Sequence, residues 1–397
     1  MRRPSKLQDR SSSLREPRRV AVLVDTSTSW GRRLIQGIHQ HALARGWQLF
    51  LEPLGMEEQV SLSGKWVGDG VIARIGYREM AADLRKLRVP VVNVSRIVLP
   101  GVTFPRVTVD LGAAARLAAE YLLARGFRNF AYFGIANLDY VALHQRAFER
   151  VLKPYGCKCA HFAAGAWHGA EPDWSLDINY LGKWLKKLPK PLAVLTWNAG
   201  GARDVLYACQ AAGLYVPDEV SILAGSDDEL FCALSPVPLS GIRGPAEQVG
   251  ARAAEFLDTL MAARSVPPRL TQIAPEQIIT RRSTESFAVS DPALVKALHF
   301  IGSNAGNPIQ VQDVARAAAV SRRVLERRFI ETLQRSPADE IRRVHMEMAT
   351  RLLAETNLPI PEVAEAAGFT SPEYLAYVFK RETGKSPLEY RKALRRT

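Results

Sequence analysis

The feature that most constrains the fold is a pattern that occurs twice in the last quarter of the chain. One copy runs from Ile309 to Phe329 and the other from Ile360 to Phe379. Each copy predicts a short helix with small alanines, a tight turn and a second helix, which Ser321 or Ser371 caps. Apolar residues four positions apart in each second helix predict one buried face, so the opposite face is free. The C-terminal region is therefore predicted to be all-α, with two helix-turn-helix units.

The free face of the second helix in the first unit is basic. It carries Arg322, Arg323 and Glu326, and Arg327 lies at its flank. Guanidinium groups can make paired hydrogen bonds to guanine O6 and N7 in the DNA major groove, and a carboxylate can accept from cytosine N4. On its own, such a string of charges is more typical of a solvated helix. Two helix-turn-helix units in one domain favour a DNA-reading surface instead.

The corresponding face in the second unit has fewer basic residues, so we expect it to contact phosphates and sense DNA shape rather than read bases. Residues 338–355 predict one long helix between the units, which would fix the distance between their second helices. The two units are therefore expected to occupy two adjacent major grooves. The predicted DNA-binding residues are Ser321, Arg322, Arg323, Glu326, Arg327, Ser371, Glu373, Tyr377 and Lys380.

The net charge of the chain agrees with a nucleic-acid partner. The 53 Lys and Arg residues outnumber the 40 Asp and Glu residues and give a formal net charge of +13. A surplus of this size attracts polyanions. Part of it lies in residues 1–17, predicted to be a basic disordered N-terminus, so the charge does not locate the DNA-binding surface.

Residues 18–283 alternate short β-rich apolar runs with amphipathic helix patterns. This order is typical of parallel sheets with right-handed crossover helices. The helices include Gly31–Arg45 and Leu111–Arg125, the second one capped by Asp110. Two such sheets in succession predict two α/β lobes with a cleft between them. The predicted strands are Val20–Asp25, Trp47–Pro53, Gly70–Ala73, Val91–Ser95, Phe130–Gly134, Ala193–Thr196 and Ser221–Gly225.

Several classes of protein are disfavoured by the motifs that the sequence lacks. It has no glycine-rich phosphate loop, nucleophile elbow or metal-ligand cluster, so neither an enzyme nor a metal or cofactor site is predicted. There is no secretory signal and no apolar run of about 18 residues, which predicts a cytoplasmic protein that does not span a membrane. The four cysteines, Cys157, Cys159, Cys209 and Cys232, are too few for a disulfide scaffold and are predicted to be reduced and buried.

Three strings in the C-terminal region form a family signature. They are the spaced Ser, Leu, Arg and Phe of Ser321–Phe329, the helix pattern of Arg343–Leu353, and the tail from Gly368 to Arg391. Together they resemble the AraC-type activator domain, which implies a DNA-binding transcription regulator. Tyr377 departs from this pattern, because many members carry a small polar residue or an arginine there, and the base preference at that position stays open.

Strings in the α/β region carry a second resemblance. Residues 20–38, 89–95, 107–134 and 216–228 resemble the LacI-type, periplasmic-binding-protein-like (type I) sugar-sensing domains. This resemblance implies a sensor over residues 18–283, a linker over 284–292 and the DNA-binding domain over 293–397. Both families imply a homodimer, and an activator implies contact with RNA polymerase.

The resemblance to sugar sensors also implies effector-binding residues in loops that follow successive strands. Carboxylates, amides and arginines can bind sugar hydroxyls, and an indole ring can cover the apolar face of a pyranose. Alternative roles stay open for some of them, with the tryptophans in the core, Arg74 and Arg96 in solvent, and Asp25 as a helix N-cap. The implied residues are Asp25, Ser29, Trp30, Arg74, Arg96, Asn137, Asp139, Arg146, Trp197, Asn198 and Asp227.

The order of the two domains, sensor first and DNA-binding domain last, resembles the xylose-responsive operon activators. Residues 65–73 and 281–301 carry this similarity, which implies D-xylose as the effector. Another sugar or a nucleoside, and repression in place of activation, remain alternatives. A sugar-modifying enzyme with an appended DNA-binding domain is a further one. Asn198 stands where the usual pattern has an aspartate, which would remove a charge from the sugar site.

Overall fold

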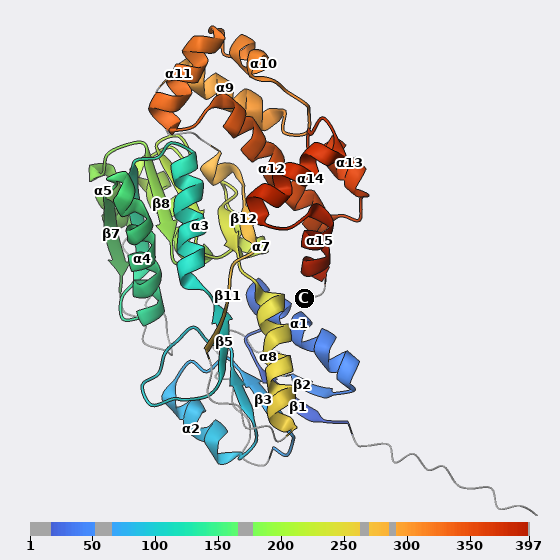
Figure 1. Ribbon diagram of the computed structural model, residues 1–397. Helices are drawn as coiled ribbons and strands as arrows, with labels where there is room; N and C mark the ends of the chain where they lie inside the picture. Colours follow the sequence, from blue (N-terminus) through green and yellow to red (C-terminus); the bar gives the residue numbers. More distant parts are fainter. Residues whose placement is uncertain (1–16, 52–65, 166–177, 263–269, 286–290, 396–397) are drawn as a thin grey trace, which may run out of the picture. The chain divides into compact units, whose positions relative to one another are not determined.

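The computed structural model describes residues 17–51, 66–165, 178–262, 270–285 and 291–395 (Figure 1). Nearly all of the predicted disordered N-terminus, and residues 286–290 of the predicted linker, lie outside this described part. The chain forms two compact units and passes between them more than once. Unit 1 contains the chain up to Ser95 together with Leu99–Thr108 and Ala246–Thr271, and unit 2 contains the rest.

The sheet of the first lobe has six strands in the order β11-β5-β4-β3-β1-β2. Strand β1 pairs in parallel with β2 and β3, and β3–β4 and β4–β5 are also parallel. Parallel strands of this kind are covered on both faces, and every residue of β3 is buried. The strands are β1 Arg19–Leu23, β2 Gln48–Leu51, β3 Gly70–Ala73, β4 Val91–Asn93, β5 Arg106–Val109 and β11 Leu270–Ile273, and the helices are α1 Ser29–Arg45, α2 Arg78–Lys86 and α8 Ala246–Met261.

Helices α1 and α8 lie side by side in unit 1 and touch through two glycines (Figure 1). A Cβ atom at Gly37 would come within 2.0 Å of the carbonyl oxygen of Glu247. A Cβ atom at Gly250 would come within 2.0 Å of the carbonyl oxygen of Leu34. Each glycine therefore lets the backbone of one helix approach the backbone of the other.

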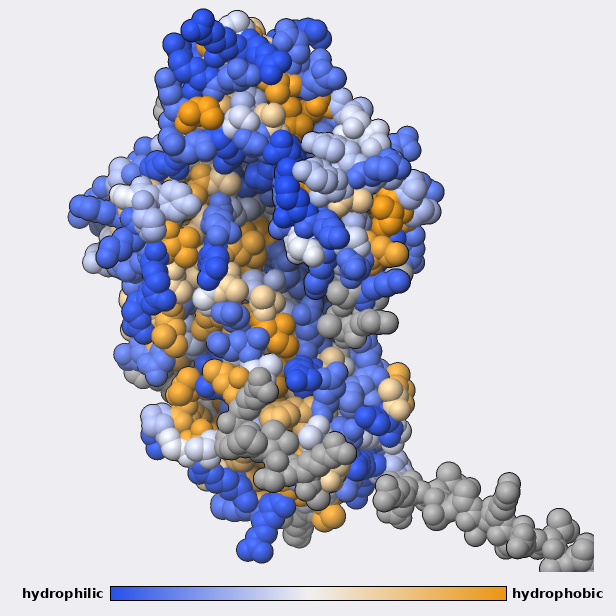
Figure 2. Space-filling model, viewed as in Figure 1, coloured by the Kyte–Doolittle hydropathy of each residue, from blue (hydrophilic) through white to orange (hydrophobic). Residues whose placement is uncertain are grey.

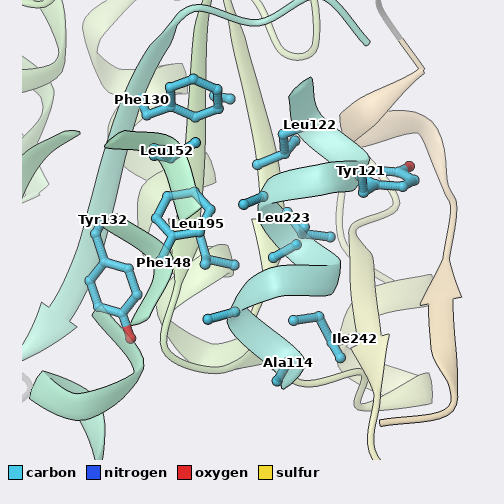
Figure 3. Close-up of a cluster of buried hydrophobic side chains, with 14 of the residues drawn as sticks. Ala114, Tyr121, Leu122, Phe130, Tyr132, Phe148, Leu152, Leu195, Leu223 and Ile242 are labelled. Atoms are coloured by element: carbon cyan, nitrogen blue, oxygen red, sulfur yellow. The ribbon is translucent and has the colours of Figure 1, made fainter. Parts of the chain in front are cut away.

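The sheet of the second lobe also has six strands, in the order β12-β10-β9-β8-β6-β7. Strand β12 is antiparallel to β10, and the other pairs are parallel. Figure 3 shows one of its cores, where side chains of α3 and α4 meet those of the strands. The strands are β6 Asn129–Ile135, β7 Cys159–Ala164, β8 Leu192–Thr196, β9 Val220–Ala224, β10 Ser240–Arg243 and β12 Gln277–Ile279, and the helices are α3 Leu111–Ala124, α4 Asp139–Leu152, α5 Ile178–Lys187, α6 Ala199–Ala212, α7 Glu229–Ala233 and the short 3-10 turns η1 Lys153–Tyr155 and η2 Arg282–Thr284.

The described part of the C-terminal region is helical and has two hydrophobic cores. Leu325 and Phe329 are fully buried in the first core, and Leu375 and Phe379 in the second. Helix α12 supplies Ile341 to the first core, and Met346, Ala349 and Leu353 to the second. The helices are α9 Pro292–Ser303, α10 Val311–Ala317, α11 Arg322–Leu333, α12 Pro337–Glu355, α13 Ile360–Ala366, α14 Pro372–Thr383 and α15 Pro387–Arg395.

The predicted caps are present at both second helices of the C-terminal units. Ser321 Oγ accepts a hydrogen bond from the Val324 amide at 3.4 Å, and Ser371 Oγ accepts one from the Tyr374 amide at 3.1 Å. The prediction of two helix-turn-helix units joined by one long helix is therefore confirmed. The two-lobed α/β prediction is confirmed as well, with strand ends that differ from the predicted ones by at most two residues where both are described.

The structure decides one open alternative and corrects one prediction. Thr28, not Asp25, caps α1, because the Thr28 hydroxyl accepts from the Gly31 amide. The four cysteines are free, as predicted, but Cys157 and Cys159 are only half-buried, because they lie before and at the start of β7, at the edge of the sheet.

The close contact of α1 and α8 predicts that Gly250→Ala destabilises the chain. The added methyl group has no space against the Leu34 carbonyl, and overpacking of this kind costs about 1–3 kcal/mol or more. Urea unfolding followed by circular dichroism measures the change. Gly302→Ala in α9 is the control, because its Cβ would meet open space and alanine favours a helix. Equal stability of the two variants would contradict the predicted clash.

Candidate effector site and nucleic-acid interface

Three side chains from separate segments of unit 2 come together near the carboxyl ends of its parallel strands. The Arg96 guanidinium lies over the Tyr140 ring, 4.9 Å from its centroid. The centroids of the Tyr140 and Trp197 rings are 6.5 Å apart. Tyr140 is buried, whereas Arg96 and Trp197 are half-buried. We call this group of a cation and two aromatic rings the Arg96–Tyr140–Trp197 cluster. It can bind the hydroxyl groups of a sugar ring as well as its apolar face.

The residue after Trp197 has a structural role as well as a candidate binding role. Asn198 Oδ1 accepts a hydrogen bond of 2.7 Å from the Gly201 amide and so caps α6. Because the cap uses Oδ1, Asn198 would meet an effector through its Nδ2 amide group. An aspartate could cap the helix equally well but could not donate.

The loop between β6 and α4 carries two more predicted effector residues, both exposed. Asn137 adopts a left-handed backbone conformation with φ of 63°, which asparagine tolerates better than most residues. Asp139 is the first residue of α4, where a negative charge interacts favourably with the helix dipole. The loop therefore presents an amide and a carboxylate at the end of the strand.

Asp227 is engaged within unit 2. Its Oδ1 accepts a hydrogen bond of 2.7 Å from Arg281 Nη1, and the two side chains are 5% and 16% exposed. Asp227 is among the sequence-predicted effector residues, whereas Arg281 was missed and appeared only within the 281–301 string. Their separation of 54 residues explains why no local pattern revealed the pair.

Arg146 does not join the Arg96–Tyr140–Trp197 cluster. The buried face of α4 consists of Tyr140, Val141, His144, Phe148 and Leu152. Arg146 is exposed on the other side of this helix. Tyr140 is the residue of α4 that the sequence analysis missed, and its position next to Asp139 at the start of the helix was the available signal.

The predicted effector residues of unit 1 lie around the ends of β1 and β3. The Asp25 carboxylate is buried and accepts hydrogen bonds from the Ser27 amide, at 2.8 Å, and the Ser27 hydroxyl, at 2.6 Å. Ser29 and Trp30 are half-buried in the first turn of α1, and Arg74 is exposed directly after β3. Each of these residues stands at the carboxyl end of a strand or just after it.

A buried histidine lies close to the Arg96–Tyr140–Trp197 cluster. His144 Nδ1 and the Tyr132 hydroxyl are 2.9 Å apart. Burial, together with the positive charge of Arg96, lowers the pKa of His144 to about 4. The imidazole is therefore neutral at physiological pH, and the positive charge of the cluster belongs to Arg96.

The exposed face of α11 is charged and partly paired with itself. Arg322 Nε donates to Glu326 Oε1 at 2.8 Å, and their side chains are 62% and 44% exposed. Arg323 and Arg327 are also exposed, and Figure 2 shows a mostly hydrophilic surface over α10 and α11. Arg328 has a different role, because it binds the carboxylate of Asp291, the residue that caps α9.

The exposed face of α14 is more aromatic than basic. Tyr377 is 62% exposed, and the Arg381 guanidinium lies over its ring, 5.6 Å from the centroid. Glu373 and Lys380 are exposed on the same helix, and Ser371 is occupied by its capping role. The two units thus present different chemistry, as the sequence predicted.

Other kinds of site receive no support in the described part of the chain. No helix there is both long enough and apolar enough to cross a membrane. No group of three or more His, Cys, Asp and Glu side chains there could hold a metal ion.

Three domain families match successive parts of the chain. Residues 19–109 match the XylR N-terminal domain, residues 119–284 match the periplasmic binding protein-like domain, and residues 314–393 match a helix-turn-helix domain. The chain is also 27% identical over 384 residues to the xylose operon regulatory protein of Escherichia coli (strain K12). The matched residues cover 94% of this chain and 96% of the relative. The chain is a DNA-binding transcription regulator with a XylR N-terminal domain.

Two further comparisons agree that the chain is similar to transcription regulators. A solved structure described as the xylose-binding transcription activator XylR matches 96% of this chain and 99% of its own, with a TM-score of 0.61 and 26% identity. The HTH-type transcriptional regulator GlxA of Rhizobium meliloti (strain 1021) is 30% identical over 236 residues, which cover 55% of this chain and 71% of the relative. Both of these proteins are named as transcription regulators.

The buried His144 predicts a defined dependence of stability on pH. Between pH 6.5 and about 4 the unfolded chain binds a proton at this residue that the folded chain does not. The free energy of unfolding therefore falls as the pH decreases through this window, by at most on the order of 3 kcal/mol. His144→Phe should lose less stability than the wild type between pH 7 and 4, measured by urea unfolding. His39→Gln, at an exposed position of α1, is the control, and equal pH slopes for all three proteins would contradict the prediction.

The different faces of α11 and α14 predict different effects on DNA binding. Arg323→Ala should relax the sequence preference by about 1–3 kcal/mol at the base pair it contacts. Lys380→Ala should weaken binding to all sequences alike. It should also make the slope of log affinity against log salt concentration shallower by about 1, the contribution of one phosphate contact. Binding to DNA selected by the protein from a random pool, at several salt concentrations, measures both effects. Lys183→Ala, exposed on α5, is the control, and unchanged binding by both variants would mean that other faces contact the DNA.

Proposed function

We propose that the chain is a cytoplasmic activator of pentose-utilisation genes that responds to D-xylose. The observation that carries this proposal is the similarity to the Escherichia coli xylose operon regulatory protein, which extends over the sensor and the DNA-binding domain together. The Arg96–Tyr140–Trp197 cluster supports it with side chains suited to a sugar. The regulator acts by binding, without turnover of the sugar.

In unit 2 the effector would contact the side chains at the ends of β6, β8 and β9 and at the start of α4. Arg96 would donate to ring or hydroxyl oxygens, Asn198 would donate through Nδ2, and Trp197 would cover the apolar face of the sugar. Asp227 would accept from a hydroxyl group beside its bond to Arg281. The other effector-binding residues that the resemblance to sugar sensors implies are Asn137, Asp139 and Arg146 in unit 2 and Asp25, Ser29, Trp30 and Arg74 in unit 1.

On the DNA side, each subunit would place α11 and α14 in adjacent major grooves. The regulator would act as a homodimer whose paired domains occupy adjacent half-sites and contact RNA polymerase. An effector can drive this change only to the extent that it binds the DNA-competent form more tightly than the other form. Residues 293–397 would form the DNA-binding domain and residues 284–292 the linker to the sensor.

Titration calorimetry with a panel of sugars tests the proposed effector. D-xylose should release heat, and L-arabinose, D-ribose and D-glucose should bind more weakly. Arg96→Gln should weaken D-xylose binding about 10-fold to 100-fold, because hydrogen bonds from a charged donor contribute about 1.5–3 kcal/mol. Arg150→Gln, exposed on α4, is the matched control.

Each other outcome contradicts a specific part of the proposal. Binding of another sugar in place of D-xylose would overturn the choice of effector. Absence of heat with every sugar would overturn sugar sensing. Formation of a product from any pentose would revive the enzyme alternative.

A further inference from the structure

The carboxylate of Asp227 is held by an arginine from the last segment of the sensor. Arg281 Nη1 donates to Asp227 Oδ1 at 2.7 Å and to the Leu239 carbonyl at 2.8 Å. The Asp227 amide donates to the Ile242 carbonyl, so the backbone of Asp227 is fixed to β10. Arg281 stands directly before η2, and η2 is the last described element before α9. One side chain therefore joins a predicted effector residue to the segment that leads to the DNA-binding domain.

The backbone of Arg281 is held as firmly as its side chain. Its amide donates to Ser240 Oγ at 2.8 Å, and its carbonyl accepts from the same hydroxyl at 2.8 Å. Ser240 is fully buried at the start of β10. A shift of Arg281 would therefore break or stretch its hydrogen bonds to β10.

The bonds continue through buried hydroxyl groups into η2. Thr284 Oγ1 lies 2.7 Å from Ser240 Oγ and 2.6 Å from the Tyr121 hydroxyl, which lies 3.0 Å from Thr280 Oγ1. Each hydroxyl has one hydrogen to donate, so donation from Ser240 to the Arg281 carbonyl sets the direction of the whole chain of bonds. Figure 3 shows the Tyr121 hydroxyl directed away from the other labelled side chains of the core.

The rest of η2 is bound to β9 and α3. Ser283 Oγ donates to the Ile222 carbonyl at 2.6 Å and accepts from the Ser240 amide at 2.9 Å. Arg125 Nε donates to the Thr284 carbonyl at 3.2 Å, and its guanidinium lies 3.5 Å from the centroid of the Tyr121 ring. Ser283 and Thr284 are fully buried, so each broken bond would leave a polar group without water. For this reason the hydrogen-bond network has few arrangements in which only some of its bonds are broken.

We propose that Arg281 is the positioning residue that couples occupancy of Asp227 to η2 and hence to the linker. A sugar hydroxyl that donates to the Asp227 carboxylate competes with the Arg281 guanidinium for its lone pairs. The arginine then shifts, and its backbone carries the shift through Ser240 and Thr284 into η2. This inference rests on the proposed function, because it needs an effector at Asp227.

Arg281→Gln tests the coupling, because it removes the charge and keeps a hydrogen-bonding side chain. The readout is the ratio of DNA affinities with saturating D-xylose and without sugar, on DNA that the protein selects from a random pool. Wild-type ratios for coupled sites are typically about 5-fold to 150-fold. In Arg281→Gln the ratio should fall toward one, while the affinity for D-xylose changes by less than about 10-fold. Arg281→Lys should restore part of the ratio, since it restores the charge.

Asp227→Asn tests the same ion pair by removing the charge of its acidic partner. It should reduce the ratio as Arg281→Gln does, and the double variant should show no further loss, because both changes remove one interaction. Arg252→Gln is the matched control, since this arginine pairs with Glu255 on the exposed surface of α8. A wild-type ratio in folded Arg281→Gln, or in Arg281→Lys and Asp227→Asn where Arg281→Gln fails to fold, would overturn the proposal.

Hydrogen exchange without any sugar separates this inference from the proposed function. The Ser283 amide donates to the Pro238 carbonyl, and the Thr284 amide donates to the Arg281 carbonyl. Both amides should exchange faster in Asp227→Asn than in the wild type and the Arg252→Gln control. Unchanged exchange would show that Asp227 does not hold η2, which overturns the coupling. Failure of every sugar to bind the wild type would instead overturn the proposed effector.

Discussion

Burial of both faces of a parallel sheet is the constraint on which the sensor depends. Strands such as β3 and β8 are buried along their whole length, so polar chemistry is confined to the strand ends. Arg96, Trp197 and Asp227 all follow strands in this way. The same constraint buries η2 against β9, where its hydroxyl groups must find partners within the protein. The position of the effector-binding side chains at the strand ends and the burial of η2, where the chain leaves the sensor, therefore both result from the packing of the sheet.

Features set by neighbouring residues could be predicted from the sequence. The caps at Asp110, Ser321 and Ser371 need only a serine or aspartate before a periodic apolar run, and all three form. The strands that were missed, such as β10 and β11, have four residues each, and half of these are polar, so their pattern is weak. Arg281 and Tyr140 were missed because their roles depend on partners far along the chain. Local rules carry no information about such pairs.

The exposed faces of α11 and α14 differ in the contacts that their side chains already make within the protein. On α11 the pairing of Arg322 with Glu326 is exposed, and such pairs contribute at most about 1 kcal/mol. Breaking this ion pair to form contacts with a base edge therefore costs little free energy. On α14 the Tyr377 ring and Arg381 form a bulky exposed group, which suits contact with a groove wall or a phosphate.

Helix α12 has a consequence for how the C-terminal region can be divided. Its first half completes the core around Phe329, and its second half completes the core around Phe379. A cut anywhere along α12 would expose the apolar face of one half or the other. The two helix-turn-helix units therefore form one cooperative folding domain, which can be exchanged between proteins only as a whole.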